Sequence, residues 1–237
     1  MLSPDKNTSP QKSLFNIYQL LSNHFGPRHW WPADSPFEVV IGAILTQNTA
    51  WTNVEQAIQN LKRADALTIE KLSGLPILQL EALIKPSGFF RQKASRLQNL
   101  AKHLQKEWQS DLAAFCSGTL DDARERLLAR PGIGPETADS ILLYATDRPS
   151  FVVDAYTRRI FGRLGFLHGR EEYDAIRLWF MQNLPEQTKL YNEYHALIVQ
   201  LAKTYCRKNQ TLCSECPLNG ACHFAKEHTR EVSGEEL

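Results

Sequence analysis

Apolar side chains recur at helical spacing along most of the chain. Between Leu14 and His24 they fall three or four positions apart, which is the period of an amphipathic helix. A helix start signal follows, with Ser35 as the cap, Pro36 at the first helical position and Glu38 as the reciprocal acid. The segment that it opens, "FEVVIGAILTQ", is apolar nearly all round, so we expect a buried helix there.

The same pattern predicts further helices, with prolines and glycines between them. Short apolar runs such as residues 151–153 are too brief to indicate a sheet, so we expect an all-α fold. Residues 1–11 and the glutamate-rich tail after Ala225 are polar, and we expect them to be disordered or solvated. The further helices are expected at about 51–63, 68–73, 76–84, 89–107, 111–117, 120–129, 135–145, 154–163, 173–183 and 188–203.

Length, composition and charge exclude little. A chain of 237 residues can form one large domain or two small ones, and 43% hydrophobic with 22% charged residues is an ordinary globular balance. The net charge of +1 neither favours nor excludes nucleic acid, because a local basic patch can hide in the total. No long apolar run or signal-peptide pattern is present, so we expect a soluble, cytoplasmic protein with no membrane partner. One charged segment could contact phosphates or form a solvated helix face; it carries Arg91, Lys93, Arg96 and Lys102.

Four of the five cysteines crowd into 17 residues near the C-terminus. Such a tight cluster in an intracellular chain indicates a metal site rather than disulfides. Four thiolates can hold a tetrahedral zinc ion or a [4Fe–4S] cluster, and ligand softness alone leaves both open. We expect the remaining cysteine, Cys116, to be buried or half-buried. The clustered cysteines are Cys206, Cys213, Cys216 and Cys222.

Two glycines stand two positions apart in "RPGIGPETAD", residues 130–139, between two predicted helices. Gly132 and Gly134 allow a very short connection, whose backbone N–H groups could approach a phosphate beside the second helix N-terminus. Such a helix–hairpin–helix would hold a DNA backbone without reading its sequence. From spacing alone, a plain hairpin between two packed helices is an equally good interpretation.

Asp154 follows a buried-looking apolar run and opens a predicted helix, 18 residues after Glu136. It is either an ordinary helix cap or a carboxylate directed from a helix start into a cleft.

The segments "LLARPGIGPETADSILLYA" and "FVVDAYTRRI", followed by the four cysteines, resemble the endonuclease III family of DNA glycosylases over about residues 33–222. The resemblance implies a two-lobed, all-α helix–hairpin–helix fold that binds double-stranded DNA containing a damaged base. It implies that Asp154 is the catalytic aspartate. The cysteine spacing matches that family's cluster loop, which implies a structural [4Fe–4S] cluster rather than zinc. It also implies DNA contacts from the hairpin region, at Gly132, Ile133, Gly134 and Thr137.

At one position the chain departs from the bifunctional members of that family. They have a lysine where this chain has Glu136, and the lysine amine forms a Schiff base with the sugar. Glutamate cannot form one, so the resemblance implies a monofunctional enzyme that releases a base and leaves an abasic site. Glu136 itself is either part of the catalytic site or an acid stabilised by the helix dipole.

Trp30, Trp31 and Trp51 flank the predicted buried helix. Any one of them could be an ordinary core residue, but tryptophan faces also stack on flipped-out bases and favour cationic ones. The pattern "WWP…GAILTQNT.W" resembles the N-methylpurine (3-methyladenine) branch of the family, which implies that these three residues line the base pocket. Lys203 is a further pocket candidate by the same resemblance. Gln47 would belong to the loop that fills the gap left by the flipped base.

The predicted organisation has two lobes and a tail. Residues 33–148 form a helical-barrel lobe that ends in the helix–hairpin–helix. Residues 149–225 form the cluster lobe, to which the N-terminal segment 1–32 also belongs, and residues 226–237 are a flexible acidic tail. The predicted activity is monofunctional hydrolysis of the N-glycosidic bond of alkylated purines such as 3-methyladenine and 7-methylguanine. We expect a monomer, associated with the nucleoid if its source is a prokaryote. Two alternatives stay open. The same scaffold could act on mispaired adenine or on uracil and thymine mismatches, or the chain could be a non-catalytic iron–sulfur DNA-binding protein.

Overall fold

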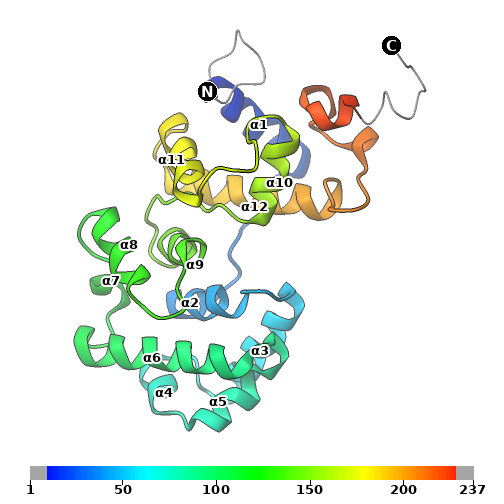
Figure 1. The fold of residues 1–237 in the computed structure, drawn as a ribbon. Coiled ribbons are helices and arrows are strands. Elements are labelled where there is room, and N and C mark those ends of the chain that lie inside the picture. The colour runs from blue at the N-terminus through cyan, green and yellow to red at the C-terminus, as the bar shows by residue number, and fades with distance from the viewer. Residues whose placement is uncertain (1–9, 228–237) are drawn as a thin grey trace. The chain divides into compact units, whose positions relative to one another are not determined.

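The computed structural model describes residues 10–227, and its regular elements are helices joined by loops (Figure 1). No strand occurs in this described part, where an isolated bridge pairs Cys206 with Thr211. The predicted all-α fold is therefore confirmed. The helices are α1 (Pro10–Phe25), α2 (Pro36–Leu45), α3 (Trp51–Arg63), α4 (Ile69–Gly74), α5 (Ile77–Ile84), α6 (Phe90–Trp108), α7 (Leu112–Phe115), α8 (Leu120–Leu128), α9 (Pro135–Ser140), α10 (Ala155–Arg163), α11 (Tyr173–Asn183) and α12 (Thr188–Thr204), with short helical elements η1 (Lys85–Ser87), η2 (Ile141–Ala145), η3 (Cys213–Glu215) and η4 (Asn219–Ala221).

The chain divides into two compact units. The central unit is Trp31–Ser150, and the terminal unit combines the chain up to Trp30 with the chain from Phe151 onward. In the central unit, α2 is the core helix: every residue from Phe37 to Leu45 is buried, and α3, α6 and η2 pack against it. The nearly continuous apolar sequence of α2 is explained by this burial on all sides.

Ser35 caps the start of α2 and Pro36 opens the helix, as the sequence predicts, but the reciprocal bond of Glu38 has a different partner. Ser35 Oγ accepts a hydrogen bond from the Glu38 N–H at 3.2 Å. The Glu38 carboxylate accepts from the Asp34 N–H at 3.1 Å, one residue before the expected partner. Lys62 lies 2.8 Å from the same carboxylate, so the buried Glu38 is paired with a cation.

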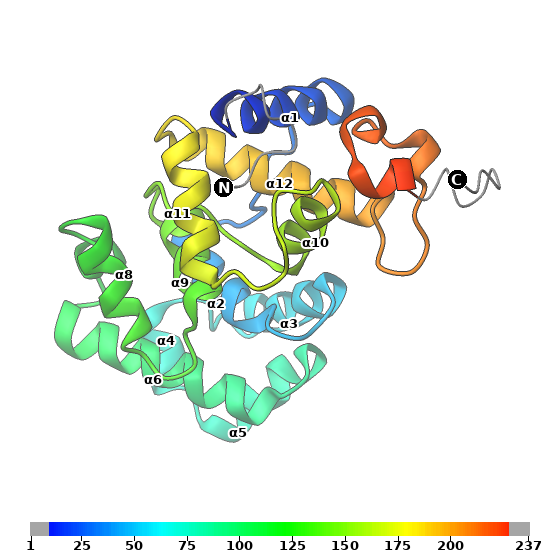
Figure 2. The same cartoon turned by 45° about the horizontal axis from the view of Figure 1, so that its top comes forward.

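The terminal unit joins the two ends of the sequence. Helix α1 packs on α11 and α12, and Figure 2 shows α1 alongside α12. The buried Tyr194 hydroxyl of α12 donates to the Leu14 carbonyl of α1 at 2.9 Å. Aromatic rings fill the core between α11 and α12, where Phe151 stacks on Phe180 with their ring centres 4.0 Å apart.

Three local expectations need correction or restriction. The helix predicted over 135–145 is α-helical only to Ser140 and continues as a single π-helical stretch, η2. Helix α1 begins at Pro10, inside the stretch 1–11 that was expected to be disordered, and the rest of that stretch lies outside the described residues. The expected flexible tail lies outside them from residue 228 onward.

No described helix is long and apolar enough to cross a membrane.

The charged segment on α6 does not form one DNA-facing surface. Lys93 is 1% exposed, and its ammonium donates to the carbonyls of Leu45 (2.8 Å) and Ser87 (2.7 Å). Burial, with a smaller contribution from the Arg96 charge, lowers the Lys93 pKa to about 8. The expectation that Lys93 could contact phosphates is therefore wrong, because its side chain fastens the end of α2 to η1.

Cys116 is buried, as expected, and burial raises the pKa of its thiol to about 11. The nearby charges of Arg126 and Arg148 oppose that increase without cancelling it. An apolar setting of this kind keeps the thiol protonated and unreactive at neutral pH.

Candidate functional site

The helix–hairpin–helix of the central unit is formed by α8, a short turn and α9. Gly132 has a φ of +82°, a conformation that favours glycine. A Cβ atom at this position would also lie 2.2 Å from the Arg96 side chain, so the turn has no room for one. Ile133 is buried, and its N–H donates to the Arg130 carbonyl at 3.1 Å. That N–H closes the turn, and the Ile133 side chain anchors it in the core.

Gln47 binds the hairpin from the loop after α2. Its amide nitrogen donates to the Gly132 carbonyl at 3.0 Å and to Thr137 Oγ1 at 2.9 Å. Its amide oxygen accepts from Arg96 Nη1 at 2.7 Å. Gln47, Arg96, Gly132 and Thr137 thus form one network, which we call the hairpin brace. The gap-filling role expected for Gln47 stays a prediction, and it would require these bonds to break. The neighbouring Asn48 is exposed, with a φ of +54°.

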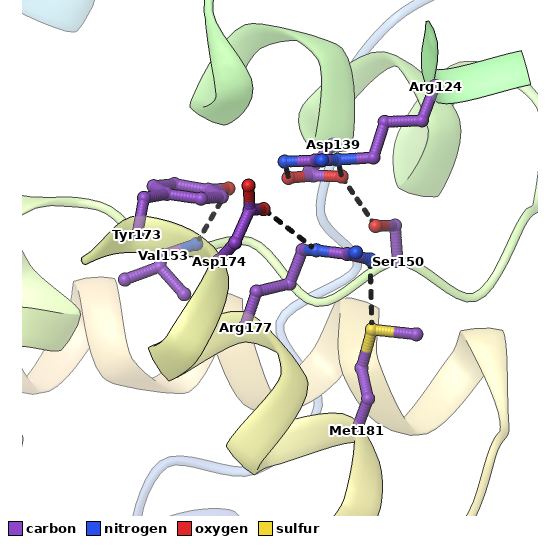
Figure 3. Close-up of polar contacts among 8 residues, drawn as sticks. All are labelled: Arg124, Asp139, Ser150, Val153, Tyr173, Asp174, Arg177 and Met181. Carbon is purple, nitrogen blue, oxygen red and sulfur yellow. Dashed lines mark hydrogen bonds and ion pairs between the residues drawn. The ribbon is translucent and has the colours of Figure 1, made fainter. Parts of the chain in front are cut away.

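A buried ion pair fastens the two hairpin helices to each other. Arg124 of α8 donates to the Asp139 carboxylate of α9, with Nε–Oδ1 at 2.9 Å and Nη2–Oδ2 at 3.3 Å. The Ser150 hydroxyl donates to the same Oδ1 atom at 2.5 Å (Figure 3). With several donors on one carboxylate, the pair is satisfied in a site where a lone charge would be strongly destabilising.

Helix α9 begins without a side-chain cap. Its N-cap residue is Gly134, Pro135 occupies the first helical position, and Glu136 follows in the first turn. Glu136 is exposed, and a negative charge at this end of a helix is favourable. Glu136 therefore lies where the sequence predicts it, in the first turn of the second hairpin helix.

Two of the three predicted pocket tryptophans come together in the central unit. The rings of Trp31 and Trp51 meet edge to face with centres 5.2 Å apart, and Tyr144 lies 5.4 Å from Trp31. Gly42 of α2 makes room for this group, since a Cβ atom there would be 2.9 Å from Trp31. The three half-buried rings form one continuous aromatic wall, and the edge-to-face contact leaves no space for a base between Trp31 and Trp51. Sequence reasoning missed Tyr144 and Gly42.

The remaining two pocket candidates, Trp30 and Lys203, belong to the terminal unit. Trp30 is half-buried. Lys203 is exposed in the last turn of α12, where its backbone carbonyl accepts from Arg207 Nε at 3.1 Å. Their pocket roles stay predictions.

Asp154 is the N-cap of α10 in the terminal unit, and its carboxylate is 13% exposed. Oδ1 accepts from the Thr157 N–H at 2.7 Å and from the Thr157 hydroxyl at 2.9 Å. His195 of α12 brings its Nε2 atom to 3.5 Å from Oδ2. The preceding residue is also held, because the Val153 N–H donates to the Tyr173 hydroxyl at 3.3 Å (Figure 3).

The environment of Asp154 keeps this carboxyl ionised. Burial on its own would raise the pKa, but the adjacent His195 and the two Thr157 donors more than offset it. The pKa of Asp154 therefore lies below its ordinary value, and the group is a carboxylate at neutral pH. Sequence reasoning predicted a site role for Asp154, which stays a prediction, and it missed His195, which stands 41 positions later.

The four clustered cysteines follow α12 in the terminal unit. Arg163 Nη1 donates to Cys206 Sγ at 3.1 Å, and the Cys222 thiol donates to the Arg163 carbonyl at 3.5 Å. Burial is the main reason why the pKa of the Cys216 thiol is raised to about 11. The Leu218 N–H lowers it, while the charges of the other three cysteines raise it further.

This donor set fits a metal centre by its chemistry. No group of three or more His, Cys, Asp or Glu side chains among residues 10–227 stands in a metal-holding arrangement. The charges of the other three cysteines nevertheless disfavour ionisation of the Cys216 thiol, and a shared cation would relieve that repulsion. The Arg163 guanidinium adds a donor to one of the sulfurs.

The family model of the HhH-GPD superfamily of base excision DNA repair proteins matches residues 41–186, more than half of the chain. This chain belongs to the HhH-GPD superfamily. The matched range includes the hairpin brace and Asp154. A provisionally named DNA repair glycosylase of Methanocaldococcus jannaschii is 47% identical over 88% of this chain and 95% of that protein. Endonuclease III of Thermotoga maritima is 31% identical over 80% of this chain and 83% of that protein.

Solved structures show the same HhH-GPD architecture. An endonuclease III–DNA complex has a TM-score of 0.81 at 21% identity and covers 94% of this chain and 100% of that one. H. pylori 3-methyladenine DNA glycosylase bound to 1,N6-ethenoadenine has a TM-score of 0.68 at 33% identity, covering 81% of this chain and 95% of that one. The resemblance to endonuclease III is therefore confirmed, and the chain is a DNA glycosylase of base excision repair.

Proposed function

We propose that this glycosylase is monofunctional and removes alkylated purines from double-stranded DNA. The observation that carries the proposal is the carboxylate of Asp154, which is mostly buried yet held ionised at the start of α10. Breaking an N-glycosidic bond by hydrolysis passes through a sugar with oxocarbenium character. A fixed negative charge in a partly water-excluded place stabilises such a cation strongly.

Cationic bases suit this site best. An N3- or N7-alkylated purine already carries positive charge, so it leaves without a separate proton donor. The aromatic wall of Trp31, Trp51 and Tyr144 offers ring faces that attract cations. The 33% identical H. pylori structure, a 3-methyladenine DNA glycosylase, supports the same class of substrate. We propose that this wall, with Trp30 and Lys203 as further candidates, contacts the flipped base.

The acid at position 136 supports base release without strand cleavage. A carboxylate cannot attack the sugar to form a Schiff base, whereas a lysine at this position could. We propose that the product is an intact strand with an abasic site, and that Glu136 lies at the pocket edge.

The hairpin would contact the DNA, and the cysteine loop would stabilise the fold. We propose that the turn at Gly132–Gly134 approaches the phosphate backbone. Cys206, Cys213, Cys216 and Cys222 would hold a [4Fe–4S] cluster, which when bound supplies a structural cross-link rather than a reactive group.

The test uses purified protein and three duplexes: DNA pretreated with a methylating agent, a uracil duplex and an adenine-mispair duplex. Released bases are identified by chromatography, and strands are examined with and without alkali. We expect 3-methyladenine or 7-methylguanine from the methylated duplex, with breaks only after alkali. Release from the uracil or mispair duplex alone would overturn the substrate class, and breaks without alkali would overturn monofunctionality.

A further inference from the structure

The two oxygens of the Asp154 carboxylate have different surroundings. Oδ1 accepts both hydrogen bonds from Thr157 and is occupied by capping α10. Oδ2 takes no part in the cap, and His195 Nε2 faces it at 3.5 Å from a different helix. Capping therefore holds the carboxylate through one oxygen, and His195 contacts the other oxygen through an interaction that capping does not require.

His195 is placed to make this contact with little freedom. It is 7% exposed on α12, which packs against α10. Because a carboxylate can only accept hydrogen bonds, a productive contact requires the proton on Nε2. At 3.5 Å the pair is looser than a direct hydrogen bond, and such catalytic contacts often tighten when substrate binds.

We propose that His195 is a positioning residue for Asp154: its Nε2–H group restrains the carboxylate at Oδ2, the oxygen that the helix cap leaves unused. This inference rests on the proposed function, in which Asp154 is the catalytic carboxylate. It adds a residue on α12 to a site whose catalytic group lies on α10. His195 itself touches no substrate and transfers no proton.

The competing explanation is an ordinary buried histidine that stabilises the fold. The two explanations can be distinguished because loss of a structural residue lowers stability, whereas loss of a positioning residue lowers the rate of base release at unchanged DNA affinity. They also differ in whether a conservative substitution restores that rate. Glutamine can place an amide N–H near the Nε2 position, and leucine cannot.

The experiment compares His195→Leu and His195→Gln with Tyr194→Phe and Asp154→Asn in the full-length protein. Tyr194→Phe is the matched control because it removes a buried hydrogen bond of the same helix without touching Asp154. The single-turnover rate is measured on the methylated duplex, and the dissociation constant on a duplex with an abasic-site analogue. Melting temperatures are recorded for all variants.

We expect His195→Leu to lower the rate roughly 10- to 100-fold, as for loss of one hydrogen bond to a charged group. His195→Gln should recover most of that loss, Tyr194→Phe should keep the wild-type rate, and all should bind DNA alike. Equal rates for His195→Leu and wild type, or equal losses for Leu and Gln, would overturn the inference.

A second measurement needs no substrate. Carbon-13 NMR follows the titration of the Asp154 carboxyl in the free protein, where His195 and Thr157 are the groups in contact with it. Removing His195 should move that titration to higher pH, and Tyr194→Phe should not move it. If His195→Leu leaves the titration in place, the inference fails. If Asp154→Asn releases base at the wild-type rate, the proposed function itself fails.

Discussion

The starts of α9 and α10 both carry a carboxylate, but they differ in how the helix is capped and in how exposed that carboxylate is. Helix α9 begins at Gly134 with no side-chain cap and carries the exposed Glu136 in its first turn. Helix α10 begins at Asp154, whose side chain caps the helix and is mostly buried. The same kind of group, a carboxylate at a helix start, is therefore an exposed charge in one place and a fixed, partly desolvated charge in the other. Only the second environment suits stabilisation of a cationic transition state.

Asp154→Asn should have the largest effect, because it removes the mostly buried charge at the start of α10. Asparagine caps helices as well as aspartate does, so the fold and DNA binding should be retained. Without the negative charge, the rate of base release should fall roughly 100- to 1,000-fold, the effect of removing one electrostatic stabiliser. Single-turnover kinetics beside circular dichroism and DNA-binding titrations would measure it. A variant that lost DNA binding together with activity would show that Asp154 acts through the structure instead.

Glu136→Lys tests whether the exposed acid of α9 stands near the sugar. The change should destabilise the helix start by no more than about 1 kcal/mol, because a positive charge opposes the dipole there. We expect the new amine to form a covalent adduct with abasic-site DNA that borohydride traps and gel electrophoresis detects. Glu136→Gln, which has no nucleophilic amine, is the control. Failure of the lysine variant to form an adduct would place position 136 away from the reacting carbon.

Gln47→Ala should act on stability rather than on the reacting groups. It removes two donated hydrogen bonds to the hairpin and the partner of Arg96. We expect the free energy of unfolding to fall by about 1–3 kcal/mol, because buried or half-buried polar groups are left unsatisfied. Urea unfolding without DNA gives the value, with the exposed Gln56→Ala on α3 as the control. Equal stability of the two variants would mean that the brace does not hold the hairpin.

The helices were largely predictable because their signals are local. The apolar period places α3 at 51–63 as observed, and α12 within one residue of its observed end. Asp154 was recognisable for the same reason, as a polar residue opening a helix after a buried run. Local sequence determines these features, and no distant partner changes them.

The contacts of the site were not predictable, because they join distant segments. Gln47 meets Arg96 across 49 positions and Gly132 across 85. Lys93 looks like its charged neighbours in the sequence, but it is buried, and two backbone carbonyls accept hydrogen bonds from its ammonium. His195 stands in an apolar helix pattern that indicates burial but not the carboxylate it faces. Such pairings depend on tertiary packing, which a single sequence does not display.

The composition of the terminal unit has a consequence for synthesis on the ribosome. The hydroxyl of Tyr194 reaches back to the Leu14 carbonyl, His24 meets Tyr205, and the Arg28 N–H donates to Glu193, each across more than 160 positions. Helix α1 is therefore made before α11 and α12, and its docking surface is complete only when both of them have been made. The contiguous central unit, translated in between, contains its own core and can fold during that interval. The docking of α1 is therefore a late step in the folding of the terminal unit. Until it occurs, the amphipathic face of α1 stays exposed to chaperones or to aggregation.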